Sequence, residues 1–255
     1  MQHLQLTELP QLQHATLLLA LSGWMDGGLV STGTVRRIME GRQAREIARI
    51  DADPFYVFNL PGNMEVAAAF RPEVEMAGGL INKAPVMPTN IFHVDPAANL
   101  VFFLGQEPHL RWQALAQFIF EVSKHVGVSR ILFMGSFGGS VPHTRPPRVY
   151  ASVSHERLLP IVKESGLRTS DYEGPASFST LLLAQCPAHQ LEMLALVAEI
   201  PGYLDGINPM SIEAVTRLLA KLLNQPVDLA SLREASTAWE LKVTEAVEKN
   251  EDLAE

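Results

Sequence analysis

The chain has 255 residues, of which 47% are hydrophobic, and this is enough to bury the core of one large domain. Its formal net charge of −8 repels a phosphate backbone, which argues against nucleic acid as a partner. A single cysteine excludes an intramolecular disulfide and no apolar stretch is long enough to cross a bilayer, so the sequence predicts a cytoplasmic protein without membrane association.

Four short apolar runs each lead into a loop that contains glycine and many polar groups. Runs of this length, with helical stretches between them, are typical of buried parallel strands. Ligands bind beyond the carboxyl ends of the strands in open α/β sheets, so we expect the four loops to converge on one rim. The runs are Leu17 to Leu21, Leu100 to Leu104, Ile131 to Met134 and Leu194 to Ala198.

Helices are predicted between these runs. Ser31 to Arg42 follows the first run, with Ser31 or Thr32 as its cap. The stretch Asn63 to Asn99 is punctuated by proline and glycine without clear periodicity, and no element is predicted there. Trp112 to Lys124 then has apolar side chains at helical spacing, which predicts a helix with one face on the sheet.

The last hundred residues contain three further helix signals. A helix from Ser177 or Ser179 onward would present backbone N–H groups at its start, which is a usable anion site. An apolar stripe from Ile212 to Leu222 predicts a second helix. The capping-box pattern Ser231-Leu232-Arg233-Glu234 then opens a third. We expect the last two helices to form a hairpin against the body or against a neighbouring subunit.

Several loops together resemble one protein family. The segments are Glu107-Pro108-His109-Leu110-Arg111-Trp112, Val141-Pro142-His143-Thr144-Arg145-Pro146, Tyr172-Glu173-Gly174-Pro175 and the closing helix from Trp239-Glu240. In this order they resemble the PAC2 family, the proteasome assembly chaperone 2-like proteins of bacteria and archaea. The resemblance implies a phosphorylase/hydrolase-like α/β fold, a three-layer domain with a central, largely parallel sheet and a small C-terminal helical part. It assigns residues 1–207 to the α/β domain and 208–255 to the helical part, and it implies a homo-oligomer.

The resemblance also implies a function for the chain. Eukaryotic and archaeal relatives help proteasome α-subunits to assemble, and some archaeal members dock through a C-terminal hydrophobic-Tyr-any-residue tail. This chain ends Asp252-Leu253-Ala254-Glu255 and lacks that tail. We therefore expect a binding or assembly protein with an undefined protein partner.

An alternative function is binding of a small anionic or nucleoside-like ligand at the rim, with hydrolase or phosphorylase chemistry. Arginines would hold the anion, and carboxylates or histidines would transfer protons. Each residue also has a structural interpretation: Asp26 as a cap or turn, the histidines as hydrogen-bonded scaffold, Arg145 as a loop anchor. The candidate residues are Trp24, Asp26, Gly27, Glu107, His109, Arg111, Ser136, Gly138, His143, Arg145, Tyr172, Glu173 and Ser177.

Other site chemistries do not match the sequence. The loop Gly135-Ser136-Phe137-Gly138-Gly139 lacks dinucleotide-binding spacing and is followed by Pro142. No P-loop pattern occurs, and Ser136 is not centred in a Gly-x-Ser-x-Gly elbow. The histidines lie far apart in the chain, and Cys186 has no adjacent base. We therefore predict no cofactor and no metal.

Overall fold

The computed structural model describes residues 3–249, and the C-terminal sequence Asp252 to Glu255 lies outside them. The described chain contains both strands and helices, and it ends in two consecutive helices. The strands are β1 (Leu4–Leu6), β2 (Ala15–Ser22), β3 (Arg45–Ile50), β4 (Glu75–Ala77), β5 (Leu80–Lys83), β6 (Asn90–Asp95), β7 (Leu100–Gln106), β8 (Val128–Gly139), β9 (Arg148–Val153), β10 (Arg168–Thr169) and β11 (Glu192–Pro201). The α-helices are α1 (Val30–Met39), α2 (Met64–Ala68), α3 (Trp112–Val126), α4 (Leu159–Glu164), α5 (Phe178–Gln185), α6 (Pro209–Leu223) and α7 (Ala230–Glu248).

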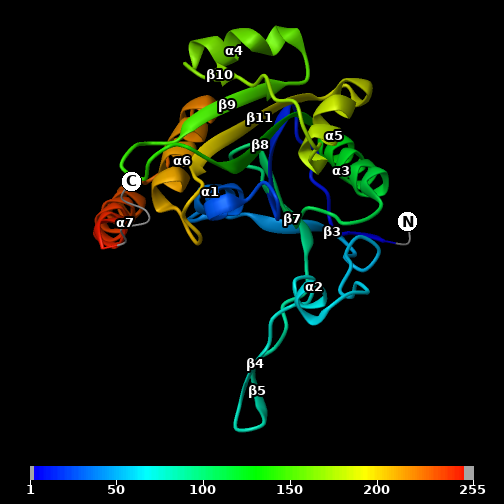
Figure 1. Cartoon of the computed structure of the whole chain (residues 1–255). Coiled ribbons are helices and arrows are strands. Elements are labelled where there is room, and N and C mark those ends of the chain that lie inside the picture. Colours follow the sequence, from blue (N-terminus) through cyan, green and yellow to red (C-terminus); the bar gives the residue numbers. More distant parts are fainter. Residues whose placement is uncertain (1–2, 250–255) are drawn as a thin grey trace.

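Nine of the strands form one sheet in the order β1-β3-β6-β7-β2-β8-β11-β9-β10 (Figure 1). The four central strands β7, β2, β8 and β11 run parallel to one another. They contain the four apolar runs of the sequence, so the prediction of a parallel centre is confirmed. On the flanks β3, β6 and β9 run antiparallel to their inner neighbours, which makes the whole sheet mixed.

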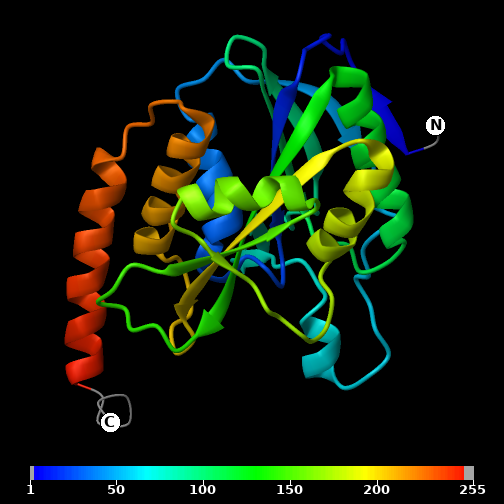
Figure 2. The ribbon, with the colours of Figure 1, turned by 90° about the horizontal axis from the view of Figure 1, so that it is seen from above.

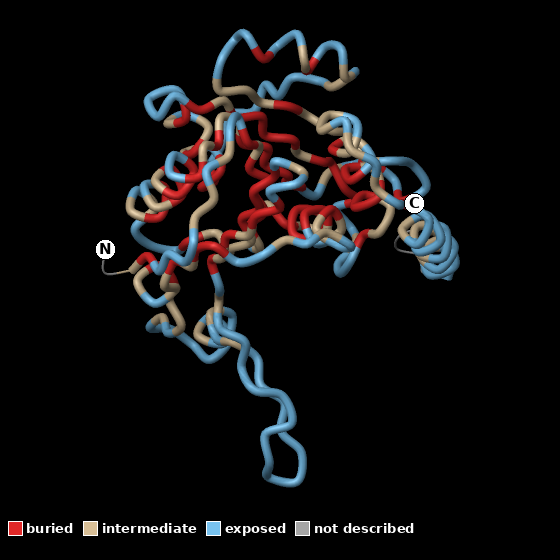
Figure 3. Tube along the Cα trace, turned by 180° about the vertical axis from the view of Figure 1, so that it is seen from behind, coloured by how far each residue is buried: buried red, intermediate tan, exposed pale blue. Residues whose placement is uncertain are grey.

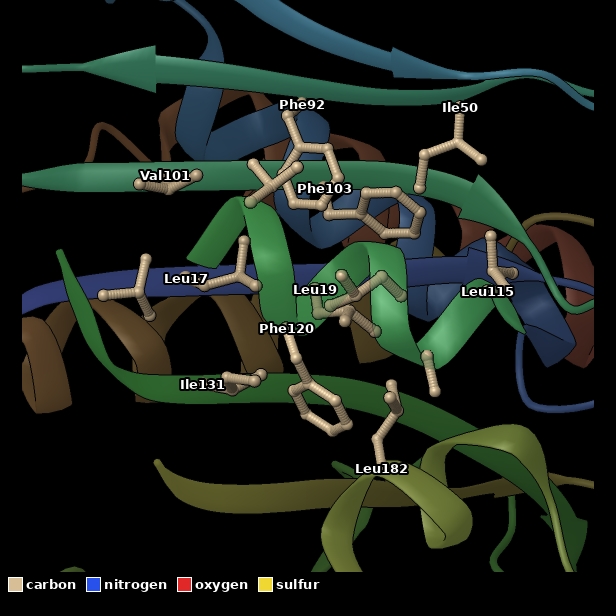
Figure 4. Packing of buried hydrophobic residues seen from close by; sticks show 14 of the residues in the cluster. Leu17, Leu19, Ile50, Phe92, Val101, Phe103, Leu115, Phe120, Ile131 and Leu182 are labelled. Carbon is tan, nitrogen blue, oxygen red and sulfur yellow. The ribbon is translucent and has the colours of Figure 1, made fainter. Parts of the chain in front are cut away.

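Helices cover both faces of the sheet and create two separate cores. Successive residues of β2 point to opposite faces, so Leu17 and Leu19 enter one core and Leu18 and Ala20 the other. Helices α3 and α5 pack on the first face, where Leu115, Phe120 and Leu182 meet the strands (Figure 4). Helices α1, α4 and α6 cover the second face. The helices can be followed in the view from above in Figure 2. The predicted three-layer α/β fold is confirmed.

Two helix starts differ from the predictions. The N-cap of α1 is Leu29, and Ser31 lies inside the first turn, where its hydroxyl accepts the Leu21 N–H at 3.2 Å. The N-cap of α7 is Leu229, and the Asp228 carboxylate accepts the N–H of Ala230 at 2.9 Å. The predicted caps were therefore wrong at both helices, because a short polar side chain near a start signal does not fix which residue adopts the cap conformation.

The C-terminal helices α6 and α7 differ in how far they are buried. Ile212, Val215 and Leu219 of α6 belong to the core on the second face of the sheet. In contrast, no residue of α7 is buried within its described length. Figure 1 shows α7 lying on the outside of α6. The division at residue 207 stays a prediction. No helix within residues 3–249 is long and apolar enough to span a membrane.

Candidate functional site

The loops after the four parallel strands lie along one edge of the sheet. Strands β7, β2, β8 and β11 are neighbours and point the same way, so their carboxyl ends at Gln106, Ser22, Gly139 and Pro201 share that edge. The rim, as this edge is called below, consists of residues 23–29, 107–111, 137–147 and 201–208. Nine of the thirteen candidate residues lie in the rim, Ser136 lies next to it on β8, and the segment before α5 supplies the other three.

Asp26, Gly27 and Ser136 connect the loop after β2 to β8. The Ser136 N–H donates to the Met25 carbonyl at 2.9 Å, and its hydroxyl donates to the Gly27 carbonyl at 2.6 Å. The Asp26 carboxylate accepts the Thr32 N–H at 3.0 Å and the Thr32 hydroxyl at 2.8 Å. Burial raises the pKa of Asp26, and the Thr32 hydrogen bonds oppose that shift. The carboxylate therefore holds the first turn of α1 in place.

Glu107 and Ser177 together accept hydrogen bonds from backbone N–H groups at the start of α5. The Glu107 carboxylate accepts the Phe178 N–H at 2.7 Å, and the Ser177 hydroxyl accepts the Thr180 N–H at 3.1 Å. A second rim contact comes from the Glu107 N–H, which donates to the Ser22 carbonyl at 2.8 Å. The chain's own carboxylate thus occupies the N-terminus of α5, where the sequence predicted an anion site.

His109 and Arg111 lie on the loop between β7 and α3. The His109 ring is exposed, and its Nδ1 accepts the Val57 N–H at 3.0 Å. Tyr56 and Phe70 stand edge-on to the ring at 5.7 and 5.6 Å between centroids. Arg111 is the N-cap of α3 with a left-handed φ of 56°, and its side chain is exposed. His109 therefore stabilises the segment before α2 through the hydrogen bond to Val57.

His143 joins the rim to the last helix. Its ring is 7% exposed and lies 2.7 Å (Nδ1) from the Tyr203 hydroxyl and 3.0 Å (Nε2) from the Thr244 hydroxyl. Its backbone N–H also donates to the Tyr203 oxygen at 3.0 Å. Trp239 of α7 stands edge-on to the same ring. The nearby Arg145 side chain is exposed.

The remaining candidates are surface residues or close-packing positions. Gly138 lies where a Cβ would come within 3.1 Å of the Gly202 Cα, at the carboxyl ends of β8 and β11. Tyr172 is 65% exposed, and its hydroxyl donates to the Pro175 carbonyl at 3.1 Å. Glu173 and Trp24 are exposed too. The structure thus divides the polar candidates among separate clusters: Asp26 with Ser136, Glu107 with Ser177, and His143 with α7.

Glu199 is a buried rim carboxylate that the candidate set omitted. It is 5% exposed at the end of β11, and its Oε1 accepts the Ser140 N–H at 3.0 Å. The Arg148 guanidinium and the Tyr150 hydroxyl each lie 3.4 Å from Oε2. The sequence contains a signal for this residue, because Glu199 is a single carboxylate within the otherwise apolar run from Leu194 to Ile200.

The rim also exposes several large apolar side chains. Trp24 is 55% exposed, Ile207 58% and Phe137 41%, and these side chains come from three different loops. Leu29, Leu110 and Tyr203 are further exposed residues of the rim. No group of three or more His, Cys, Asp or Glu side chains in residues 3–249 is arranged to hold a metal ion.

Three cavities have no candidate residue in their lining, although Pro146 and Pro147 of the rim line one of them. One of about 290 Å³ lies at the amino ends of the central strands, near Thr16 and Arg130. A second of about 450 Å³ lies between α6 and the segments around β9 and β10, and a third of about 890 Å³ lies beside α3. None of the three is lined by a candidate residue of the rim.

The family model described as PAC2 family matches residues 20–247. A proteasome-assembly chaperone homologue of Mycobacterium tuberculosis is 24% identical with a TM-score of 0.77, over 94% of this chain and 98% of that one. A PAC2 family protein of Streptomyces avermitilis is 24% identical with a TM-score of 0.75, over 94% and 97%. An archaeal proteasome activator of Pyrococcus furiosus is 18% identical with a TM-score of 0.70, over 96% and 99%. No curated protein matches the chain.

Proposed function

The chain belongs to the PAC2 family, whose model spans residues 20–247, and we propose that it is a protein-binding assembly factor that acts through the apolar side chains of its rim. The single observation that carries this proposal is the difference in exposure between hydrogen-bonded polar side chains and large apolar side chains in the rim. Asp26, Glu107 and His143, which are suited to acid–base chemistry, are hydrogen-bonded within the fold, whereas the side chains of three large apolar residues are exposed. These are Trp24, Phe137 and Ile207. Exposed aromatic side chains on neighbouring loops are typical of protein-binding surfaces.

The class of partner is part of the same proposal. Two similar solved structures are a proteasome-assembly chaperone homologue and an archaeal proteasome activator. Proteasome α-subunits are therefore the first partners to test. In this proposal, binding of these partners depends on the rim. A cytoplasmic location and a homo-oligomeric state complete the proposal.

Direct binding to purified proteasome α-subunits of the source organism tests this function. Combined Trp24→Ala and Phe137→Ala substitutions should weaken binding at least tenfold, because buried aromatic anchors dominate such interfaces. Leu241→Ala is the matched control, since Leu241 is 67% exposed on α7 and is not a residue of the rim. Equal binding by all three proteins would remove the rim from the mechanism.

Ligand binding at the rim is the weaker alternative, because Glu107 already occupies the start of α5. Thermal unfolding with phosphate, nucleosides, nucleotides and sugar phosphates distinguishes it from protein binding. A ligand at one hundred times its dissociation constant stabilises the native state by about 2.7 kcal/mol. Stabilisation by one ligand that disappears in Arg145→Ala would favour the ligand-binding enzyme, whereas an unchanged melting temperature throughout supports the assembly factor.

A further inference from the structure

The cavity of about 290 Å³ lies on the second face of the sheet, at the amino ends of the central strands. Leu100, Thr16 and Arg130 line it and are neighbours in register on β7, β2 and β8. Leu132 and Leu194 are paired two residues further along β8 and β11, and they share this face because alternate residues of a strand point the same way. These five residues form the floor of the cavity.

Two helices and a turn cover the floor. Ile161 of α4 and the last two residues of α6, Leu222 and Leu223, line the cavity from above, and Ala98 lines it from the turn before β7. In Figure 3 the central strands are mostly buried, whereas α4, at the top of the view, is mostly exposed. The cavity therefore lies between the buried sheet and a helix at the surface.

The lining is apolar apart from a few polar side chains. Seven of its eleven residues are alanine, leucine or isoleucine. The amides of Asn99 and Gln225 donate to the carbonyls of Gln13 and Ala98, each at 3.0 Å. Among the described residues Arg130 is the one charged member of the lining, and its side chain is 39% exposed. Such a lining suits an amphipathic ligand with an anionic head group.

The charges around Arg130 leave room for that anion. The Glu192 carboxylate accepts Nε and Nη2 of Arg130 at 3.0 and 2.7 Å through one oxygen, and Nε of Arg157 at 2.8 Å through the other. One carboxylate is thus shared by two guanidinium groups, so this trio keeps one positive charge. Nη1 of Arg130 makes no hydrogen bond within residues 3–249 and is available to a ligand.

The volume of the cavity sets the size of the ligand. Because a water molecule occupies about 30 Å³ in the liquid, 290 Å³ corresponds to about ten non-hydrogen atoms. A carboxylate with a medium-length alkyl chain, such as octanoate, has this size. Its chain would remove apolar surface from water at about 0.8 kcal/mol for each methylene group buried.

We propose that this cavity binds a medium-chain carboxylate. The alkyl chain lies on Leu132 and Leu194, and the carboxylate binds Arg130 at the solvent side of the cavity. The rim is at the carboxyl ends of the same strands, at the opposite edge of the sheet. The ligand site therefore does not depend on the function proposed above.

Isothermal titration of the full chain with octanoate tests the site. One equivalent should bind at saturation. Wild-type protein should bind 1-octanol at least tenfold more weakly, because 1-octanol has no charge for Arg130. Acetate should bind at least a hundredfold more weakly, because it lacks the alkyl chain.

Three variants locate the site. Arg130→Gln should weaken octanoate binding at least tenfold and leave the affinity for 1-octanol unchanged. Ala98→Leu places extra carbon atoms in the cavity and should weaken the binding of both ligands. Arg157→Gln is the matched control: it makes the same charge change beside the same Glu192, but Arg157 is 60% exposed and does not line the cavity. Its affinity for octanoate should stay within threefold of wild type.

Circular dichroism checks that each variant is folded, and the comparison of octanoate with 1-octanol needs only the wild type. Absence of saturable octanoate binding at millimolar concentration would overturn the proposal. Equal affinities of the wild type for octanoate and 1-octanol would also overturn it. So would equal losses of octanoate affinity in Arg130→Gln and Arg157→Gln, since the charge of the surface rather than the cavity would then attract the anion.

Discussion

His143 and Thr244 lie 101 positions apart in the chain and are joined by a hydrogen-bond contact of 3.0 Å between Nε2 and Oγ1. Tyr203 approaches the other ring nitrogen at 2.7 Å. One imidazole therefore ties the loops after β8 and β11 to α7, which has no buried residue in its described length. The imidazole ring therefore attaches the last helix to the rim.

Replacing His143 should loosen α7 more than the rest of the fold. His143→Ala removes both side-chain contacts and leaves the Tyr203 and Thr244 hydroxyls without this partner, at a cost of about 1–3 kcal/mol. Hydrogen exchange should accelerate first at the amides of α7. Thr244→Val keeps the Tyr203 contact and should have a smaller effect; equal effects of the two variants would contradict this account.

Asp26 should make the stability of the fold decrease with rising pH. Burial raises its pKa above 3.8, so between that value and the folded-state pKa the native state binds more protons than the unfolded state. Its stabilising contribution is therefore complete at low pH and is lost as pH rises through this window. Asp26→Asn should gain free energy of unfolding relative to wild type over the same window, measured by urea denaturation.

The Thr32 hydroxyl provides a check on this prediction. Its hydrogen bond opposes the effect of burial on the pKa of Asp26. Thr32→Val should consequently raise that pKa further and extend the decline of stability to higher pH. A stability difference between wild type and Asp26→Asn that does not vary with pH would refute the assignment.

Gly139 should not tolerate a larger side chain. A Cβ there would lie 2.6 Å from Oε1 of the buried Glu199, which accepts the Ser140 N–H. Gly139→Ala should cost about 1–3 kcal/mol, because overpacking displaces that carboxylate. Gly62→Ala is the control: Gly62 is exposed and has only Val66 side-chain atoms within 4 Å, so its cost should stay within about 0.5 kcal/mol. Chemical denaturation of both variants gives the comparison.

Cys186 should be unreactive while the protein is folded. It is fully buried, and burial raises its pKa to about 12. At pH 8 the thiolate fraction then falls roughly 10³-fold below that of a free cysteine. A thiol reagent such as DTNB should react with one equivalent in urea and only very slowly in native buffer. Rapid labelling of the native protein would show that the thiol is accessible.

The centre of the fold was predictable because each central strand has a local sequence signal. Leu17 to Leu21 and its three counterparts are apolar on both sheet faces, so the runs are continuous. Strands β3 and β6 were missed: Arg45–Ile50 alternates with charged residues, and Asn90–Asp95 ends a proline-rich stretch. Their pairing with each other stabilises both, and that partnership spans a segment with no periodicity.

The rim was predictable as a place but not as a set of contacts. Parallel strands put their carboxyl ends together, so the convergence of the loops follows from strand direction alone. The partners of Glu107 and His143 depend on where α5 and α7 return to the body. Nothing near either residue in the sequence encodes those paths, and the structural alternatives for Asp26 and His143 were the ones the contacts support.

The central position of β2 has a consequence during synthesis. Its two sheet neighbours, β7 and β8, both follow it by more than 70 residues, so β2 leaves the ribosome with no strand to pair with. At about 5–20 residues per second, Leu100 is added roughly 4 to 16 s after Ser22. During that interval an apolar segment is exposed to the cell, and a ribosome-associated chaperone would find its binding site at residues 15–22.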